Sequence, residues 1–526
     1  MHDYPVLFTS YLLMGYSEHR FTEWAKEYGG IISLKVTNGT IVVLSDMRSI
    51  KELLDDRSIE LSSRPAFYGL DVVTGGKHFL TAPSVWGKPP HAIIRTESHF
   101  WKISRKVMQP LVSPQAVQKY LPIEDAETAQ LLYDILHSPE VTNVPSFIAS
   151  IRLMARNLHQ EFYNHISRTT LSFITSIVFG QPTPRHDSPV AMLFRDFILQ
   201  FSTTFSPEAA PVDFVPVLKY IPERWAPWKK LWRETRRLQR SLYFGLLDDA
   251  EKRASSGIKQ DTFVEKIMER QAELGLDRET VAYGQFLHNP PYICGVLLDG
   301  GSETSASYLK NFVLCLVKSP ASLRKAQKEI DSVIGERRMP VPDDIHNLPY
   351  VQAVIKETHR LRPVGPTAVP HASVNDCKYR GYTIPKGTPI FMNICMIVSL
   401  IGQIKDGVFH DPNIFERTED FWPERYLLTP DGTKPELPEG LGNIRSTLQF
   451  GSGKRLCPGM HLANTNTSLA VMRLLWAFDF APINESDKQP PTWDIEKEYF
   501  DVSLLSLSHT DHPAQYSYIA GHNLNP

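Results

Sequence analysis

Residues 450–459 read FGSGKRLCPG, and the prediction of the fold works outward from this stretch. Glycines at positions 451 and 453 allow left-handed or crowded backbone conformations beside a flat ligand. Arg455 offers a fixed fork of donors that fits a carboxylate, and Pro458-Gly459 ends the loop before a helix begins. The single thiolate of Cys457 in such a loop suits an axial iron ligand. The alternative is a cysteine that packs in the interior as a small hydrophobic residue.

Length and composition limit the class of protein. At 526 residues, with 42% hydrophobic and 22% charged residues, the chain is predicted to be globular with a substantial core. Its formal net charge is -2, so no general field favours nucleic acid as a partner. The five cysteines are scattered, which argues against a zinc site or a disulfide framework and indicates a reducing compartment.

The loop carries five fixed identities in the pattern Phe-x-x-Gly-x-Arg-x-Cys-x-Gly, filled by Phe450, Gly453, Arg455, Cys457 and Gly459. This pattern resembles the haem-binding loop of the cytochrome P450 monooxygenases. The resemblance implies that the Cys457 thiolate binds the iron of haem b (iron protoporphyrin IX), that Arg455 neutralises a haem propionate and that Phe450 packs beside the thiolate. It also implies a mainly α fold with a small β region, the cytochrome P450 fold.

The apolar segment 293–306 is predicted to be a helix whose middle is opened by small and polar residues. Gly300 and Gly301 each cost roughly 1 kcal/mol relative to alanine inside a helix. Small residues let a ligand approach the backbone, and Thr304 can bond back to a preceding carbonyl or hold a water. The segment resembles the family's distal helix, which implies that Glu303 and Thr304 relay protons toward dioxygen. The alternative is a Gly-Gly pair that joins two helices.

Glu357 and Arg360 lie three residues apart, which allows an ion pair on one face of a helix. The helix is strongly apolar and ends before Pro363, so burial of the pair is expected, and loss of one partner would be costly. The segment resembles the family's Glu-x-x-Arg helix. This resemblance implies a further partner in a later Pro-Glu-Arg element, which is present and ends at Arg425.

Two further positions are candidates for binding a ligand carboxylate. Trp101 and Arg105 lie four residues apart on one face of a predicted helix, so an indole N–H and a guanidinium can reach the same group. In the family this pair holds a haem propionate, and the resemblance assigns His371 to the second propionate. From the residues alone, a half-buried surface pair and a loop histidine with a local hydrogen bond are the alternatives.

The N-terminal part is predicted to be rich in β structure. The runs 31–36 and 40–44 flank Asn38-Gly39, the strongest short signal for a β-hairpin. A helix is expected over residues 46–55. A short apolar patch in the first 20 residues is far below the roughly 20 apolar residues that span a bilayer. No N-terminal transmembrane anchor is predicted, and the expected location is cytoplasmic or peripheral on the endoplasmic reticulum.

We expect a single domain over residues 1–526. Its predicted parts are a β-rich region at 21–65, a helical haem-binding body at 99–501 and an atypical tail at 502–526. Four segments interrupt the family pattern as insertions, namely 83–98, 141–160, 284–292 and 395–403. The segment 141–160 is predicted to split a helix, and the tail is predicted not to form the usual closing hairpin.

The motifs and the resemblance predict a haem-thiolate monooxygenase that hydroxylates or epoxidises a hydrophobic small molecule with dioxygen. Similarity of residues 421–428 and 450–464 to fungal members implies secondary-metabolite biosynthesis, although motifs do not fix a substrate. Electrons are expected from a separate NADPH-cytochrome P450 reductase, because no flavin or nicotinamide fingerprint occurs in the chain. The chain is expected to be a monomer. The alternative function is a haem-binding pseudoenzyme or inactive copy without turnover.

Overall fold

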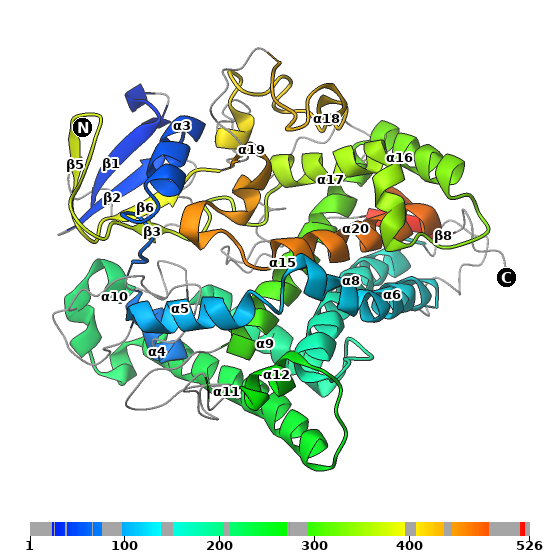
Figure 1. Ribbon diagram of the computed structural model, residues 1–526, viewed down its shortest axis with the longest axis horizontal. Helices are drawn as coiled ribbons and strands as arrows, with labels where there is room; N and C mark the ends of the chain where they lie inside the picture. The colour runs from blue at the N-terminus through cyan, green and yellow to red at the C-terminus, as the bar shows by residue number, and fades with distance from the viewer. Residues whose placement is uncertain are drawn as a thin grey trace.

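The structure is a computed structural model, mainly helical with a small β region at one end (Figure 1). It describes residues 24–25, 27–36, 39–65, 67–75, 97–137, 151–204, 211–270, 273, 293–394, 407–435, 444–482 and 516–520. The fold class predicted from the sequence is therefore confirmed. Among the described residues, no helix combines the length and the apolar character that a bilayer-spanning segment requires.

Helices make up most of the described chain. The longer ones are α4 (Tyr68–Thr74), α5 (Glu97–Met108), α6 (Pro114–Leu136), α8 (Ile151–Phe179), α9 (Pro189–Thr203), α11 (Pro227–Ser255), α12 (Phe263–Glu269), α15 (Ile293–Lys318), α16 (Pro320–Val333), α17 (Pro349–Leu361) and α20 (Met460–Ala477). One-turn helices are α3 (Met47–Ile50), α10 (Pro211–Phe214), α18 (Arg425–Leu428) and α19 (Ile444–Thr447). Short 3₁₀ turns are η2 (Pro216–Tyr220), η3 (Glu223–Trp225), η4 (Pro342–Asn347), η5 (Val408–His410), η6 (Leu448–Phe450) and η7 (Gly453–Arg455).

The β region joins segments that are far apart in the sequence. Its strands are β1 (Ile31–Val36), β2 (Gly39–Leu44), β3 (His371–Ala372), β4 (Cys377–Tyr379), β5 (Tyr382–Ile384) and β6 (Pro389–Met392). Strands β1, β2, β6 and β3 form one sheet in that order, and β4 pairs with β5. The predicted hairpin is confirmed, because β1 and β2 pair antiparallel from Ile31 with Leu44 to Val36 with Gly39.

The helix expected over residues 46–55 forms in two parts. Asp46 caps α3 by accepting a hydrogen bond from the Ser49 backbone N–H at 2.7 Å. The chain then continues from Lys51 to Asp56 as a wider π-helical segment, η1. Leu53 and Leu54 in η1 are fully buried. This segment matters for function because it lies directly against the loop around Cys457.

Helices α6, α8, α15 and α20 pack on one another in the centre and right of the molecule as drawn in Figure 1. Helix α15 packs closely on α8 at Gly301, where an added Cβ would lie 2.6 Å from the Ile174 side chain. Side chains of α15 are buried along almost its whole length. Helix α11 crosses α15 where the ring of Tyr243 lies on Gly295. The small residues of α15 therefore admit neighbouring helices as well as any ligand.

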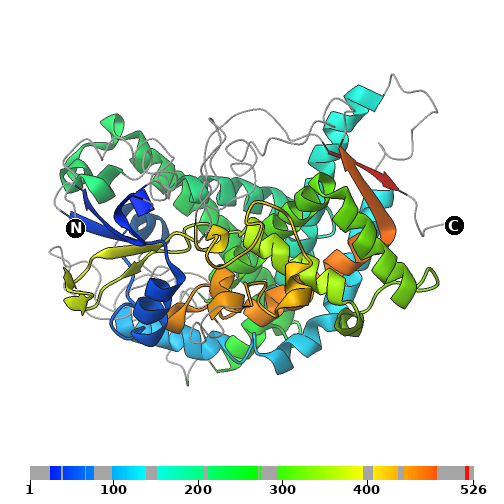
Figure 2. The same cartoon turned by 90° about the horizontal axis from the view of Figure 1, so that it is seen from above.

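Two of the predicted interruptions lie partly within the described residues. Residues 151–160, the second half of the segment 141–160, belong to α8, which runs without a break to Phe179. In the tail, β8 (Tyr516–Ala520) pairs antiparallel with β7 (Phe478–Pro482) (Figure 2), so the tail does contribute a strand, while the segment 483–515 between them lies outside the described residues. The segments 284–292 and 395–403 lie outside the described residues, as does 83–98 apart from its last two positions in α5.

Candidate functional site

The loop at residues 450–459 has the backbone that its glycines predict. Gly451 and Gly453 have φ of +90° and +59°, in the region where side chains are strained. At Gly453 an added Cβ would lie 2.0 Å from the Leu54 carbonyl oxygen and 2.7 Å from Ser58 Cβ. From the sequence alone, this crowded backbone is expected to face a flat ligand. The structure shows instead that Gly453 is crowded by η1, which fixes the loop against the β region.

Cys457 follows the tight part of the loop and precedes α20. Its backbone N–H donates to the Phe450 carbonyl at 2.9 Å, which closes the loop. Of the four cysteines that the structure describes, the other three are buried and Cys457 alone is partly exposed. Although the residue as a whole is partly exposed, its sulfur is surrounded by protein atoms, and this burial raises the pKa of Cys457, while the Gly459 backbone N–H and the Arg105 charge act in the opposite direction. The interior-packing alternative therefore fits Cys457 less well than the other described cysteines.

Positive charge gathers beside the loop. Arg105 Nη1 donates to the Leu456 carbonyl at 2.7 Å, and Arg455 Nε donates to the Ser62 carbonyl at 2.8 Å. The Arg455 guanidinium also lies 4.5 Å from the ring centroid of Trp101. The pKa of Arg455 is lowered well below its usual value by burial, and the charges of Arg64 and Arg105 lower it further. A ligand that brought carboxylates to this cluster would relieve the repulsion.

Trp101 supplies an observation that fits such a ligand. The pair predicted on one helical face lies in α5, with Trp101 and Arg105 both directed at the loop that carries Cys457. The Trp101 Nε1–H is buried and has no hydrogen-bond partner among the residues that the structure describes. A buried donor without a partner is costly, so a native acceptor is expected there. A haem propionate beside Trp101 and Arg105 would satisfy both groups.

His371 lies in β3, 2% exposed, on the same side of the site. Its Nδ1 donates to the Leu61 carbonyl at 2.9 Å, which leaves Nε2 for another group. Burial lowers the pKa of His371 well below its usual value, and the charges of Arg64 and Arg455 add to the effect. A neutral His371 cannot donate from Nε2, so a propionate at this position would have to bring a proton onto the ring.

Helix α15 presents an open turn. Gly300 is exposed, and an added Cβ there would meet no atom within 4 Å. Thr304 Oγ1 donates to the Gly300 carbonyl at 2.5 Å, the back-bonding that the sequence predicts. Glu303, the neighbouring acid, accepts a hydrogen bond from Ser307 at 3.3 Å. The helix is continuous here, so the alternative of a Gly-Gly joint between two helices is excluded.

The predicted ion pair of α17 is buried and has the expected third partner. Glu357 accepts two hydrogen bonds from Arg360, at 2.8 and 2.9 Å, and lies 3.0 Å from Arg425 Nε. The Trp422 backbone N–H also donates to Glu357 at 2.9 Å. Exposure is 0%, 1% and 2% for the three charged side chains. The motif therefore fixes the segment that leads from α17 to α18.

Sequence reasoning missed two neighbours of the loop. Arg64 is buried and donates to the carbonyls of Val369 and Pro370 at 2.6 and 2.8 Å, and burial lowers its pKa to about 9. His359 has a ring stacked on Tyr308 and 5.6 Å from the Phe450 ring centroid. His359 stands inside the Glu-x-x-Arg motif, and Arg64 lies in the stretch Ser62-Ser63-Arg64-Pro65 that follows η1. Their spacing carried no signal of where the side chains point.

The fold and the cysteine loop define the class of the haem-thiolate monooxygenases. The protein-family model described as Cytochrome P450 matches residues 5–498. The chain belongs to the cytochrome P450 family.

Similar proteins agree over almost the whole chain. A cytochrome P450 monooxygenase of Armillaria gallica is 36% identical over 491 residues, which cover 93% of this chain and 82% of the relative. The cytochrome P450 monooxygenase ple5B of Rhodocybe pseudopiperita is 33% identical, covering 96% of this chain and 86% of the relative. A solved structure of a zebra fish cytochrome P450 with progesterone superposes with a TM-score of 0.64 at 21% identity, covering 90% of this chain and 94% of that one.

Membership of the family fixes the cofactor and the class of reaction. The cofactor is haem, iron protoporphyrin IX, and the protein is an oxidoreductase of the monooxygenase type. Such enzymes use dioxygen, a substrate and electrons from a redox partner. The buried Trp101 donor, the cluster of cations and the partly exposed Cys457 all fit this cofactor.

Proposed function

We propose that Cys457 holds the haem iron and that the chain hydroxylates or epoxidises a hydrophobic small molecule in secondary-metabolite biosynthesis. The observation that carries this proposal is the position of Cys457, partly exposed in a glycine loop and beside Arg105. When bound, haem with a thiolate ligand supplies dioxygen activation, because the thiolate pushes electron density that favours O–O cleavage.

The cations beside the loop hold the two propionates in this proposal. Trp101 and Arg105 bind one, and Arg455 and His371 bind the other. These contacts stabilise the haem-bound protein. One propionate gives the buried Trp101 N–H an acceptor, and the negative charges offset the repulsion among the arginines. Phe450 packs beside the sulfur. We expect His371 to take up a proton on haem binding, because a carboxylate nearby favours its charged form.

Glu303 and Thr304 act as the proton relay. Thr304 Oγ1 lies on the open turn of α15 beside Gly300, where a ligand can approach the backbone. Its hydroxyl both accepts and donates, so it passes on a proton that it receives. Glu303 supplies that proton from its carboxyl group, as general acid-base catalysis requires.

The proposal about substrate class rests on the relatives. They are fungal cytochrome P450 monooxygenases, among them atE of Aspergillus terreus at 31% identity and patI of Penicillium expansum at 32%. A natural product of apolar character is the substrate that we assign. The electron donor in this proposal is NADPH-cytochrome P450 reductase, and the enzyme works as a monomer.

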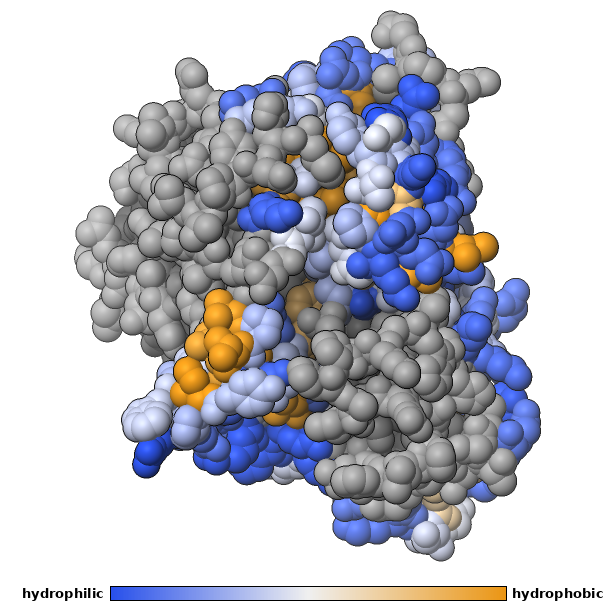
Figure 3. Space-filling view, turned by 90° about the vertical axis from the view of Figure 1, so that its left-hand side faces the viewer, coloured by the Kyte–Doolittle hydropathy of each residue, from blue (hydrophilic) through white to orange (hydrophobic). Residues whose placement is uncertain are grey.

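An exposed surface supports a peripheral location on the endoplasmic reticulum. Val217, Tyr220 and Trp225 in η2 and η3 are 65%, 70% and 64% exposed. Lys219 and Arg224 lie over the rings of Tyr220 and Trp225. Apolar and aromatic side chains with adjacent cations suit the interface of an anionic membrane. On the face of the molecule drawn in Figure 3, hydrophobic residues (orange) form separate patches among polar residues (blue).

The test is the carbon monoxide spectrum of the reduced, haem-supplemented protein. We expect the long-wavelength Soret band that thiolate ligation produces, its loss in Cys457→Ala, and its retention in the matched control Cys377→Ala. An unchanged band in Cys457→Ala refutes the ligand assignment. A normal band without product formation in the presence of reductase, across apolar substrates, indicates a pseudoenzyme instead.

A further inference from the structure

A small pocket lies in the β region, at the left end of the molecule in Figure 1. Its cavity volume is about 60 Å³. Mostly aliphatic side chains of β1, β2 and β5 form part of its lining. Four aromatic side chains complete the lining, namely Trp24, Tyr28, Tyr379 and Tyr382. The volume suits one small chemical group rather than a whole drug-sized ligand.

The four aromatic side chains come in two pairs from two separate elements. Tyr379 in β4 and Tyr382 in β5 are partners across a hairpin, so their side chains project from the same face of it. Trp24 and Tyr28 lie four residues apart in the helical stretch before β1, which places them on one face as well. Strand β1 is an edge strand, and its successive residues 31–34 line the pocket. The pocket therefore lies along this edge, between the two aromatic faces.

Carboxylates accept hydrogen bonds from two of these rings. The Tyr28 hydroxyl donates to Glu27. The Tyr379 hydroxyl donates to Glu52. Hydrogen bonds from Tyr379 and Arg48 hold the pKa of Glu52 below its usual value, so this carboxylate is ionised at neutral pH. A carboxylate on the hydroxyl raises the electron density of a phenol ring, and the face of such a ring attracts a cation more strongly.

One of the four rings already accepts a cation. The Arg380 guanidinium lies 5.0 Å from the ring centroid of Tyr379, and its Nη2 lies 3.4 Å from a Glu52 oxygen. The Arg380 side chain is 44% exposed, so it approaches the ring from the solvent. The ring and its carboxylate therefore attract positive charge. Inside the pocket, away from water, the same attraction is stronger for a cation that is small enough to enter.

We propose that this pocket binds a quaternary ammonium group, as found in choline. Aromatic rings around a compact cation are the arrangement by which proteins recognise such groups. A quaternary ammonium suits the pocket better than a primary one, because it has no N–H donor that the aliphatic walls would leave without an acceptor. Its methyl groups pack on the side chains of β1 and β2, and its charge faces the rings. The proposal is independent of the haem and of the reaction.

The competing interpretation is an apolar pocket that takes any small alkyl group, and the charge of the ligand decides between the two. Isothermal titration of the haem-loaded full chain at constant ionic strength compares choline with its neutral isostere, in which carbon replaces the nitrogen. We expect choline to bind more tightly by roughly tenfold or more, because only the cation is attracted by the rings. Equal affinity for the two ligands, or no binding of choline, overturns the proposal.

Variants show whether choline binds in this pocket. Trp24→Leu and Tyr382→Leu each remove a ring and should weaken choline binding roughly tenfold, whereas Tyr382→Phe keeps the ring and should match wild type. The Tyr382 side chain is 45% exposed, so its replacement leaves the core intact. The control Tyr133→Leu removes a ring that is 57% exposed on α6 and should leave the affinity unchanged. Wild-type affinity in both Trp24→Leu and Tyr382→Leu overturns the proposal.

Vesicles then identify the source of the quaternary ammonium group. Co-sedimentation compares phosphatidylcholine vesicles with phosphatidylethanolamine vesicles, whose headgroup is a primary ammonium. A preference for phosphatidylcholine that is lost in Tyr382→Leu assigns the pocket to a choline lipid. Binding of free choline without this preference assigns it to a soluble choline compound. Failure of the proposed function is separate, because a protein without the thiolate band would still show these differences in binding.

Discussion

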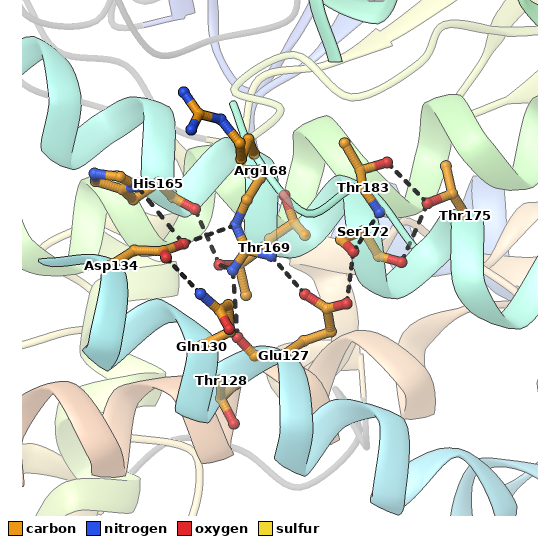
Figure 4. A network of polar contacts seen from close by, with 12 residues as sticks. Glu127, Thr128, Gln130, Asp134, His165, Arg168, Thr169, Ser172, Thr175 and Thr183 are labelled. Carbon is orange, nitrogen blue, oxygen red and sulfur yellow. Dashed lines mark hydrogen bonds and ion pairs between the residues drawn. The ribbon is translucent and has the colours of Figure 1, made fainter. Parts of the chain in front are cut away.

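Two buried ion-pair networks hold this molecule together, one behind the cysteine loop and one between α6 and α8. In the first, Glu357 faces two arginines, Arg360 and Arg425. In the second the ratio is reversed, because Arg168 in α8 lies 2.7 Å from Glu127 and 3.2 Å from Asp134, both in α6 (Figure 4). The first network ties loops to a helix, whereas the second ties two helices side by side.

The difference lies in what satisfies each charge. Both Glu357 oxygens accept hydrogen bonds, and the two arginines around it donate to the backbone carbonyls of five residues between α17 and α18, namely Phe409, Glu416, Arg417, Thr418 and Asp420. In the α6–α8 network Glu127 accepts from Arg168 and from Ser172, and Ser172 in turn accepts from the Thr183 backbone N–H (Figure 4). The first network therefore shapes irregular chain near the site, whereas the second aligns two helices and holds the short segment after α8 through Thr183.

A third acid extends the comparison. Glu124, one turn before Glu127 in α6, is fully buried, and within the described part of the chain neither of its carboxyl oxygens has a hydrogen-bond partner. Burial raises the pKa of Glu124 to about 8, a rise that Arg473 moderates and Asp125 increases. Glu357 thus faces two arginines, Glu127 faces one, and Glu124 has no hydrogen-bond partner among the described residues. The cost of removing each charge should follow that order.

The largest effect is expected at Glu357. Glu357→Gln leaves Arg360 and Arg425 buried without a counter-charge, which should cost about 3–5 kcal/mol of stability. Because both arginines hold the segment after α17, haem retention should fall with stability. Thermal unfolding and the haem content of the purified variant measure the two effects. A variant with wild-type melting temperature and full haem content would contradict the importance given to this network.

The second effect has the opposite sign. Because the pKa of Glu124 in the folded protein lies above its unfolded value of about 4.3, the folded state binds more protons between these values. Stability should therefore fall as pH rises from about 4 to about 8, and become flat above. Glu124→Gln should remove this slope, worth at most about 5 kcal/mol. Denaturant unfolding at a series of pH values tests it, and an unchanged slope would show that Glu124 finds a partner or water.

The third effect is intermediate. Glu127→Gln removes one of the two acids beside Arg168, but Asp134 remains at 3.2 Å to balance the charge. The amide oxygen of the substituted side chain can also still accept from Ser172. We expect a loss of about 1–3 kcal/mol, smaller than at Glu357, because the arginine keeps a counter-charge. The measurement is again denaturant unfolding. A loss of stability as large as that of Glu357→Gln would show that Asp134 does not balance the charge of Arg168.

Motifs predicted the first network and not the second, and the reason is physical. Glu357 and Arg360 lie on one helix, so their spacing alone brings them together, and family resemblance supplied Arg425. Arg168 and Glu127 are 41 residues apart in sequence and lie on two different helices. No local sequence pattern indicates that α6 and α8 pack with these two residues opposite each other. Tertiary pairing of this kind cannot be read from one sequence.

The candidate site shows the same boundary between local and tertiary information. The glycine conformations of the cysteine loop, the Thr304 back-bond and the helix that carries Trp101 with Arg105 all follow from local sequence. Sequence did not reveal that Gly453 is crowded by Leu54, nor that Glu303 turns toward Lys310. Both contacts depend on how the elements pack and on which side-chain rotamer is populated.

The smallest effect provides the reference for the series. Glu424 lies at 3.2 Å from the Tyr350 hydroxyl and is ion-paired with Lys325, whose side chain is 58% exposed. Lys325→Met should cost less than about 1 kcal/mol, because water screens the pair, and the difference from wild type should shrink in high salt. Denaturant unfolding at low and high ionic strength measures both points. A cost near that of Glu127→Gln, insensitive to salt, would mean that burial does not rank these pairs, and the order proposed for the three glutamates would lose its basis.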